Sequence, residues 1–354
     1  MYSIIRLRTS SKNHLSRNMS SLAPGHILRG THWSYQISQP LRGDRTQTSS
    51  IFKAEVIQAC NDNSSTTPRW ASIKVASPSD PISVQNLARE YQVYCLPAIA
   101  SAKCFRTFYD LIDNKTIALE WLDTTLAEVE YQPTTYIYSL ISEVLRALLQ
   151  SCVILEALGF VNTDYKPANV LLSRTKTNDP TAKVGDLGLA VFPAGSRFNC
   201  QPYAMRAPEI FLGQACTGPS QVWAIAAMLL SWIRPGILGA WDSPSKFIDD
   251  AWSMAKIKRL FPHWIIPTPD EVDDCVLKAV VEGAISCSRD VPDLQAILPF
   301  EEETEKVEMP QQLRDLLRLM LVVSPFERPS AAFVLSSKEF GSFEKITKEG
   351  SIVS

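Results

Sequence analysis

Three side chains of the types that phosphoryl transfer requires stand close together in VNTDYKPANVLL, residues 161–172. Asp164 can accept the proton of an attacking hydroxyl, Lys166 can neutralise charge on a moving phosphoryl group, and Asn169 can bind a metal ion. The simpler alternative is a polar turn before a strand. Because the spacing D-x-K-P-x-N is more specific than a turn requires, the sequence predicts a phosphotransfer loop.

Two further segments contain charged residues that would complete such a site. Lys74 ends the apolar stretch ASIK, and burying its ammonium without a partner would be costly. Glu90, on the predicted helix that follows, is the expected partner, and the pair can direct the ammonium to the phosphates of a nucleotide. Asp186 stands in GDLG, where it is expected to hold magnesium. A strand lysine is often a solvated edge residue and D-x-G turns are common, so the argument depends on their combination.

A structural ion pair is predicted between two segments that are far apart in the chain. Glu209 lies in RAPEI and Arg328 in SPFERPSA, each beside prolines and apolar residues. A guanidinium group can bind a partly buried carboxylate through two parallel hydrogen bonds. The pair is therefore expected to support the C-terminal part of the fold.

The apolar patterns that must position these residues change from strands to helices near residue 123. Strands are expected over residues 51–59, 70–76, 116–122 and 184–191, and helices over residues 83–96, 136–159, 220–233 and 311–323. Gly159 stands where it would end the long helix. The patterns predict a small strand-rich lobe followed by a large helical lobe.

Taken together, these segments resemble the eukaryotic protein kinase family over residues 33–343. The matched motifs are the V-A-I-K lysine, the glutamate of the next helix, the catalytic loop H-R-D-L-x-x-x-N, the D-F-G aspartate and A-P-E. In that order they correspond to Lys74, Glu90, Asp164 with Asn169, Asp186, and residues 207–209. Lys166 resembles the serine/threonine class, and DLG with Arg206 before A-P-E resembles the branch with cyclin-dependent and SR-protein kinases.

The resemblance implies an α+β, bilobal, protein-kinase-like fold that uses ATP and Mg²⁺. An antiparallel-sheet lobe with one helix would cover residues 31–122, and a mainly helical lobe residues 123–345. A basic leader or tail (1–30) and a C-terminal tail (346–354) would flank them. The family's nucleotide contacts map onto Glu120, Leu122 and Gly43, with Leu119 at the gatekeeper position, and its metal ligands onto Asn169 and Asp186.

The glycine-rich loop of the family is nearly absent here. Its three glycine positions fall at Asp44, Thr46 and Ser49, and only Gly43 lies nearby. Glycines let backbone amides approach phosphates, so nucleotide binding is expected to be weaker than the family pattern implies.

Three further departures concern support and regulation. Asn162 and Thr163 replace the histidine and arginine of H-R-D, and Gln221 replaces the aspartate that braces the catalytic loop. In the family that arginine grips a phosphorylated activation loop, so control of this kind is not expected. The Gln221 amide can still hydrogen-bond to the loop backbone, less strongly than a carboxylate.

Composition limits the other classes of function. The 354 residues carry a formal net charge of −2, which argues against a nucleic-acid partner. No apolar run reaches the roughly 18 residues that span a membrane. Eight scattered cysteines without a C-x-x-C pair, and four histidines, indicate reduced thiols rather than a zinc site. A protein substrate is the expected partner; the oligomeric state is left open.

Two segments have alternative interpretations. Residues 1–21 are basic and rich in serine, as in a mitochondrial transit peptide, or they form a basic tail on a protein of the cytoplasm or nucleus. The acidic run EEETE, residues 301–305, is expected to be a solvated loop rather than a surface for basic partners.

The leading hypothesis is an active serine/threonine protein kinase that transfers the γ-phosphate of ATP to a protein hydroxyl. The alternative is a pseudokinase that acts as a binding or scaffold module, favoured by the abnormal phosphate loop and the missing brace. Phosphotransfer to a small molecule is a third hypothesis, which the A-P-E segment disfavours.

Overall fold

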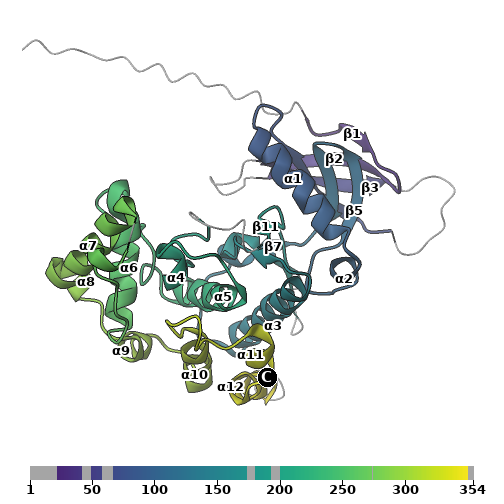
Figure 1. Cartoon of the computed structure of the whole chain (residues 1–354). Helices are drawn as coiled ribbons and strands as arrows, with labels where there is room; N and C mark the ends of the chain where they lie inside the picture. The colour runs from purple at the N-terminus through teal and green to yellow at the C-terminus, as the bar shows by residue number, and fades with distance from the viewer. Residues whose placement is uncertain are drawn as a thin grey trace, which may run out of the picture.

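The computed structural model describes residues 22–41, 49–57, 67–173, 180–192, 200–272 and 274–349. In these ranges the chain forms a sheet-rich N-terminal lobe and a helical C-terminal lobe, seen in Figure 1 as two parts. The expected α+β, two-lobed architecture is confirmed.

Six strands of the described chain form the antiparallel sheet of the small lobe, in the spatial order β1-β2-β3-β4-β6-β5. Their bounds are Ile27–Arg29 (β1), Ser34–Leu41 (β2), Ser49–Ile57 (β3), Trp70–Ala76 (β4), Phe108–Asp113 (β5) and Thr116–Glu120 (β6). The register places Lys74 of β4 between Ile51 and Ile117 on the neighbouring strands. The sheet begins at Ile27, before the expected lobe boundary at residue 31.

Helix α1 carries Glu90 toward the sheet. The helix spans Pro81–Tyr94, and the Asp80 side chain caps it by accepting a hydrogen bond from the Ile82 N–H at 3.0 Å. Leu87, Glu90 and Tyr94 are buried and follow one another by three and four residues, so they share one face of the helix. A glutamate on this buried face requires a partner from the sheet.

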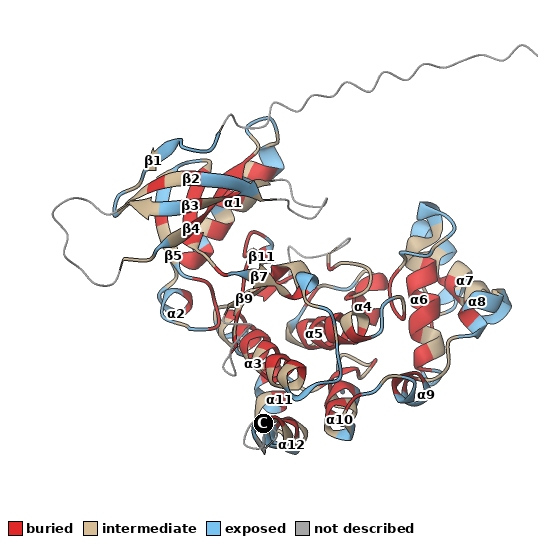
Figure 2. Cartoon of the chain, turned by 180° about the vertical axis from the view of Figure 1, so that it is seen from behind, coloured by how far each residue is buried: buried red, intermediate tan, exposed pale blue. Residues whose placement is uncertain are grey.

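Two apolar helices, Thr135–Ala157 (α3) and Gly218–Ile233 (α5), lie at the centre of the helical lobe. Helix α2 (Pro97–Ala100) lies between α1 and β5 in the chain. The helices of the helical lobe are Thr135–Ala157 (α3), Pro208–Phe211 (α4), Gly218–Ile233 (α5), Asp249–Leu260 (α6), Cys275–Asp290 (α7), Pro292–Gln295 (α8), Phe300–Glu305 (α9), Gln311–Met320 (α10), Ala331–Ser336 (α11) and Lys338–Glu349 (α12). Short 3₁₀ turns are Leu126–Glu128 (η1), Pro167–Asn169 (η2), Lys246–Ile248 (η4) and Pro269–Glu271 (η5). Figure 2 shows buried residues concentrated in α3, α5 and α6.

Helix α3 is long and apolar enough to cross a membrane by composition alone, but in this fold it packs against α5, α11, α12 and β10. Gly159 follows its end with φ +76°, a left-handed conformation that glycine adopts without strain. The predicted end of the helix is therefore confirmed.

Short strands on both sides of α3 in the sequence, β7 before it and the others after it, position the predicted phosphotransfer loop. They are Thr124–Thr125 (β7), Val161–Asn162 (β8), Val170–Ser173 (β9), Thr181–Val184 (β10) and Ala190–Val191 (β11), paired as β10-β9-β7 and β11-β8. The continuous strand predicted over residues 184–191 is wrong, because the chain leaves the sheet after Val184 and turns through Asp186 with φ +55°.

The acidic run is a helix rather than the expected loop, and Glu301, Glu302 and Glu305 are exposed to solvent as expected. Glu303 in α9 is 3% exposed, and its carboxylate accepts hydrogen bonds from the Leu298 N–H at 3.0 Å and from Lys306 at 2.8 Å. Two tryptophans of the segment that follows α5, Trp252 and Trp264, are buried in the helical lobe.

Candidate active site

Three charged side chains meet where β4, α1 and the loop after β10 come together. The Lys74 ammonium lies 2.6 Å from Glu90 Oε2 and 2.9 Å from Asp186 Oδ1. Lys74 and Glu90 are both buried, so either charge would be costly without the other. The predicted contact between Lys74 and Glu90 is present, and Asp186 shares the same ammonium.

Mutual attraction keeps Lys74 and Asp186 ionised. Burial lowers the pKa of the Lys74 ammonium, but attraction by Asp186 and Glu90 outweighs burial, so this pKa is raised. Burial raises the pKa of Asp186, but attraction by Lys74 outweighs it, so this pKa is lowered. At neutral pH the site therefore offers a cation for phosphate oxygens and a carboxylate for a metal ion.

Helix α1 also anchors the turn that presents Asp186. The left-handed conformation of Asp186 is one that aspartate tolerates better than most residues. Its Oδ1 accepts a hydrogen bond from the Gly188 N–H at 3.3 Å, and Arg89 donates to the Gly188 carbonyl at 2.7 Å. The helix that supplies Glu90 is thus linked to Asp186 by a second route.

The loop between β8 and β9 gathers the three residues of the predicted phosphotransfer motif. The Lys166 ammonium lies 3.1 Å from Asp164 Oδ2, and Asn169 Nδ2 donates to the same oxygen and to the Asp164 carbonyl, both at 2.9 Å. Burial raises the pKa of the Asp164 carboxyl, and Lys166 only partly offsets this. A carboxylate held in place with a raised pKa is a better proton acceptor than an ordinary aspartate.

The residues that replace H-R-D and its brace still support this loop. Asn162 Oδ1 accepts a hydrogen bond from the Asp164 N–H at 3.0 Å, and Gln221 Oε1 accepts one from the Asn162 N–H at 2.8 Å. The predicted bond from the Gln221 amide to the loop backbone is present, with the amide oxygen as acceptor. Asn162 Nδ2 and Gln221 Nε2 are buried without a partner among the described residues, so this support is incomplete.

Thr163, the residue before Asp164, was expected at the position of the family's arginine. Its hydroxyl donates to the Leu189 carbonyl at 3.0 Å, and its carbonyl accepts a hydrogen bond from the Gln201 N–H at 3.1 Å. The residue therefore ties the loop to the segment before α4 through neutral hydrogen bonds and brings no charge to the site.

A cavity of about 580 Å³ lies between the lobes; Lys74 and Asp186 of the first group and Asn169 of the second line it, whereas Asp164 and Lys166 are not among its lining residues. Leu122 is also among its lining residues. Glu120 is not, because its carboxylate binds Lys183 Nζ at 2.7 Å and the Thr107 N–H at 2.8 Å. Of the predicted nucleotide contacts, Leu122 therefore lines the cavity, the Glu120 side chain is engaged elsewhere, and Gly43 lies outside the described residues.

Two cations in this cavity were not predicted from the sequence. The Lys53 ammonium lies 4.3 Å from the centroid of the Trp70 ring and 4.4 Å from that of Trp121, a cation–π arrangement between two rings. The Arg106 guanidinium lines the cavity and donates to the Glu120 carbonyl at 2.6 Å. Neither residue belongs to a motif that the sequence analysis used, and no strand was predicted next to Arg106.

Asn169 and Asp186 suit a hard divalent cation such as Mg²⁺. The Asn169 Nδ2 group is used by Asp164, which leaves the amide oxygen as a ligand. The ionised Asp186 carboxylate lines the same cavity. An amide oxygen and a carboxylate, completed by phosphate oxygens and water, form the oxygen ligand set that Mg²⁺ prefers.

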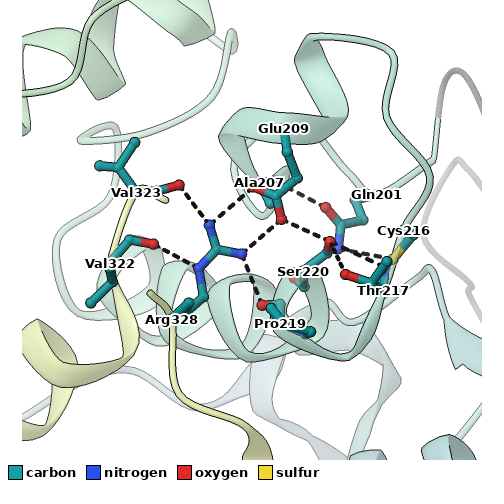
Figure 3. Close-up of polar contacts among 10 residues, drawn as sticks. All are labelled: Gln201, Ala207, Glu209, Cys216, Thr217, Pro219, Ser220, Val322, Val323 and Arg328. Atoms are coloured by element: carbon teal, nitrogen blue, oxygen red, sulfur yellow. Dashed lines mark hydrogen bonds and ion pairs between the residues drawn. The ribbon is translucent and has the colours of Figure 1, made fainter. Parts of the chain in front are cut away.

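The predicted ion pair in the helical lobe is confirmed, and Figure 3 shows its surroundings. Arg328 donates to the two carboxylate oxygens of Glu209 at 2.7 and 3.0 Å. The guanidinium also donates to the carbonyls of Val322, Val323 and Pro219 at 2.7–2.9 Å. The pair joins α4 to the turn after α10. Both side chains are buried, and the hydrogen bonds above satisfy their polar groups.

A strand-rich lobe and a helical lobe that meet at a cavity with Lys74, Asp186 and Asn169 define a phosphotransferase-like architecture. Residues 54–340 match the model of the family described as "Protein kinase domain", and the chain belongs to this family.

Three curated relatives illustrate the similarity. The "Stress-activated protein kinase JNK" of Drosophila melanogaster is 26% identical over 220 residues, which is 60% of this chain and 56% of the relative. The "Homeodomain-interacting protein kinase 2" of Mesocricetus auratus is 26% identical over 227 residues, 55% of this chain and 19% of the relative. A "Probable dual specificity protein kinase YAK1 homolog" of Encephalitozoon cuniculi is 34% identical over 86 residues, 24% of this chain and 21% of the relative. The matched region thus spans 56% or less of each of these relatives.

Proposed function

We propose that this chain is an active serine/threonine protein kinase that transfers the γ-phosphate of ATP to a hydroxyl group of a protein substrate, with Mg²⁺ as the metal. The observation that carries the proposal is the Lys74 ammonium, held at once by Glu90 and Asp186 at 2.6 and 2.9 Å. This arrangement places a phosphate-binding cation directly beside a metal-binding carboxylate.

In the proposed mechanism each of these residues has a separate role. Asp164 accepts the proton of the substrate hydroxyl, and Lys166, 3.1 Å from its carboxylate, stabilises charge on the transferred group. Lys74 orients the phosphates, while Asn169 and Asp186 hold Mg²⁺. The metal, when bound, neutralises charge on the phosphate oxygens. Most of the rate comes from positioning and electrostatics rather than covalent chemistry.

We also propose that activity does not depend on a cation before Asp164. Thr163 stands there and forms only neutral hydrogen bonds, so a phosphorylated activation segment would find no arginine at this position. This separates the chain from kinases that such an arginine controls.

A pseudokinase that serves as a binding or scaffold module is the second candidate. The unpartnered amide groups of Asn162 and Gln221 favour it, because they weaken the support of the loop. Thermal melting with millimolar Mg²⁺ and ATP, beside phosphate transfer to a peptide library, separates the two. A rise in melting temperature together with transfer to serine or threonine supports the kinase. The absence of both effects supports the scaffold.

The raised pKa of Asp164 predicts that activity is lost on acidification earlier than an ordinary aspartate would allow. The proposed base acts as a carboxylate, so kcat/KM should fall about tenfold per pH unit below this pKa, which burial moves above the usual range. A pH profile of kcat/KM checks this, with melting curves at each pH to show that the protein stays folded. A flat profile down to the pKa of an ordinary aspartate would contradict it.

A further inference from the structure

Two cysteine side chains from either side of α4 lie in contact. Cys200 is half-buried in the segment before α4, and Cys216 is buried just before the start of α5. Both are reduced, and the Cys216 thiol donates a hydrogen bond to the Cys200 sulfur. Figure 3 shows Cys216 beside Gln201, the residue after Cys200, whose Nε2 lies 3.7 Å from the Cys216 sulfur.

The surroundings make the two thiols chemically different. The hydrogen bond from Cys216 lowers the pKa of the Cys200 thiol, and the nearby Arg206 guanidinium adds to this effect, while burial opposes it. Donation to Cys200, together with burial, raises the pKa of the Cys216 thiol. Because the thiolate is the nucleophilic form of cysteine, Cys200 is the more reactive of the two.

Other cysteines of the described chain are in a different position. Cys104 and Cys152 are buried, and burial raises their pKa values to about 11 and about 12, which makes them unreactive. Cys200 is accessible in part, ionises more readily and has a second thiol against it. This is the arrangement of a peroxide-sensitive cysteine with a resolving cysteine.

We propose that Cys200 and Cys216 form a site of oxidative modification, at which hydrogen peroxide converts the two thiols into an intramolecular disulfide. In the first step the Cys200 thiolate attacks a peroxide oxygen and becomes a sulfenic acid. The O–O bond breaks, and the hydroxide that leaves takes up the proton that Cys200 had released. In the second step the Cys216 sulfur attacks the Cys200 sulfur, the S–O bond breaks, and the hydroxyl leaves with the Cys216 proton as water. The two thiols thus lose two electrons, and the peroxide is reduced to two molecules of water.

The contact between the sulfurs favours this second step over further oxidation. Donation to Cys200 is the largest cause of the raised pKa of Cys216, and oxidation of Cys200 removes this cause. Cys216 is 0% exposed, so peroxide reaches Cys200 first. A disulfide, rather than a sulfinic acid at Cys200, is therefore the expected product.

The disulfide changes a segment that contacts the phosphotransfer loop. The Gln201 N–H donates to the Thr163 carbonyl at 3.1 Å, and Gln201 has φ +65°, a conformation that few residues other than glycine adopt. Arg206 donates to the Cys200 carbonyl at 3.1 Å. Drawing Cys200 toward Cys216 disturbs these contacts, whereas neither cysteine is among the lining residues of the nucleotide cavity. If the proposed kinase function holds, on which this step rests, the disulfide lowers phosphate transfer and leaves nucleotide binding unchanged.

The test follows the disulfide in the full chain by mass spectrometry. Trypsin produces one peptide of residues 198–206, which contains Cys200, and one of residues 207–246, which contains Cys216. The protein is reduced, freed of reductant, treated with a small excess of hydrogen peroxide, blocked with N-ethylmaleimide and digested. We expect the two peptides to be joined, with a mass two hydrogen atoms below their sum, and dithiothreitol to separate them.

Single substitutions separate the roles of the two cysteines. Cys216→Ser should abolish the joined peptides and leave Cys200 as a sulfenic acid that dimedone labels. Cys200→Ser should abolish both the joined peptides and the dimedone label at this site. Cys275→Ser, the same change at an exposed cysteine of α7, should give the joined peptides in wild-type yield.

The wild-type protein alone can overturn the proposal, so the test does not depend on the folding of a variant. The modification site is wrong if peroxide leaves Cys200 and Cys216 unjoined, or if it converts Cys200 to a sulfinic acid. It is equally wrong if Cys200 becomes joined to a different cysteine or to a second copy of the chain, which a gel run without reductant detects.

Kinetics and melting curves of the same samples test the effect on transfer. Oxidation of the wild type should lower kcat/KM for the peptide substrate about tenfold or more, reversibly with dithiothreitol, and leave the melting shift with Mg²⁺ and ATP unchanged. A disulfide that forms without loss of transfer contradicts the control of transfer, while the modification site stands. A reduced protein that transfers no phosphate overturns the proposed kinase, whereas the joined peptides are detected without any activity.

Discussion

Replacing Asp164 by Asn should reduce phosphate transfer by about 10²- to 10⁴-fold and leave nucleotide binding nearly unchanged. Asparagine keeps the shape of the side chain and an oxygen that can accept from Lys166 and Asn169, now 3.1 and 2.9 Å from Asp164 Oδ2. It removes the group that accepts the proton of the substrate hydroxyl. Steady-state kinetics with the best library peptide, beside calorimetry with the Mg²⁺-nucleotide complex, measure the two effects separately.

The matched control is Asp293→Asn, the same chemical change at an exposed position of α8. It should keep wild-type kcat/KM. Wild-type transfer in Asp164→Asn would show that another group accepts the proton, and loss of nucleotide binding would show that Asp164 helps to form the cavity instead.

Replacing Arg328 by Leu should lower the free energy of unfolding by about 3–5 kcal/mol. The change leaves the Glu209 carboxylate 3% exposed without its cation, and it also removes three hydrogen bonds to backbone carbonyls. Urea denaturation followed by tryptophan fluorescence measures the loss. Removing one member of a buried pair is far more damaging than removing both, because the remaining charge stays in the core.

Two further variants serve as controls for the Arg328→Leu result. Arg318→Leu breaks exposed pairs with Glu301 and Asp315, at 2.9 and 3.1 Å, and should cost no more than about 1 kcal/mol. The double change of Arg328 and Glu209 to leucine should recover part of the lost stability. If the free energy of unfolding of Arg328→Leu lies within about 1 kcal/mol of the wild-type value, the pair does not stabilise the lobe as its burial indicates.

The two lobes and the charged cluster were predictable because they depend on patterns within short stretches of the sequence. Strand and helix periodicity gave β4 and α1, and a lysine in a buried strand followed by a helical glutamate leaves few other partners. The spacing of Asp164, Lys166 and Asn169 is short enough that one loop brings them together.

The failures occurred where tertiary contacts override the local pattern. Periodicity cannot show that the chain turns at Asp186 into a left-handed conformation, since a contact with Arg89 of α1 helps to fix that turn. The burial of Glu303 in the acidic run was not expected, because it depends on Lys306 and the Leu298 N–H, which lie outside the run. Arg106 was missed for a similar reason, because its acceptor, the Glu120 carbonyl, belongs to strand β6, 14 residues further along the chain.

The Lys74 bridge to Glu90 and Asp186 has a consequence for signalling. The chain closes this bridge with its own residues, and Arg89 fastens the same helix to Gly188. Thr163, the residue before Asp164, is uncharged and offers no cation to a newly added phosphate. Under the proposed function, the resting state is active, and we expect a regulator that moves α1 away from the sheet to lower activity by separating Glu90 from Lys74. We therefore expect control through this helix to be inhibitory.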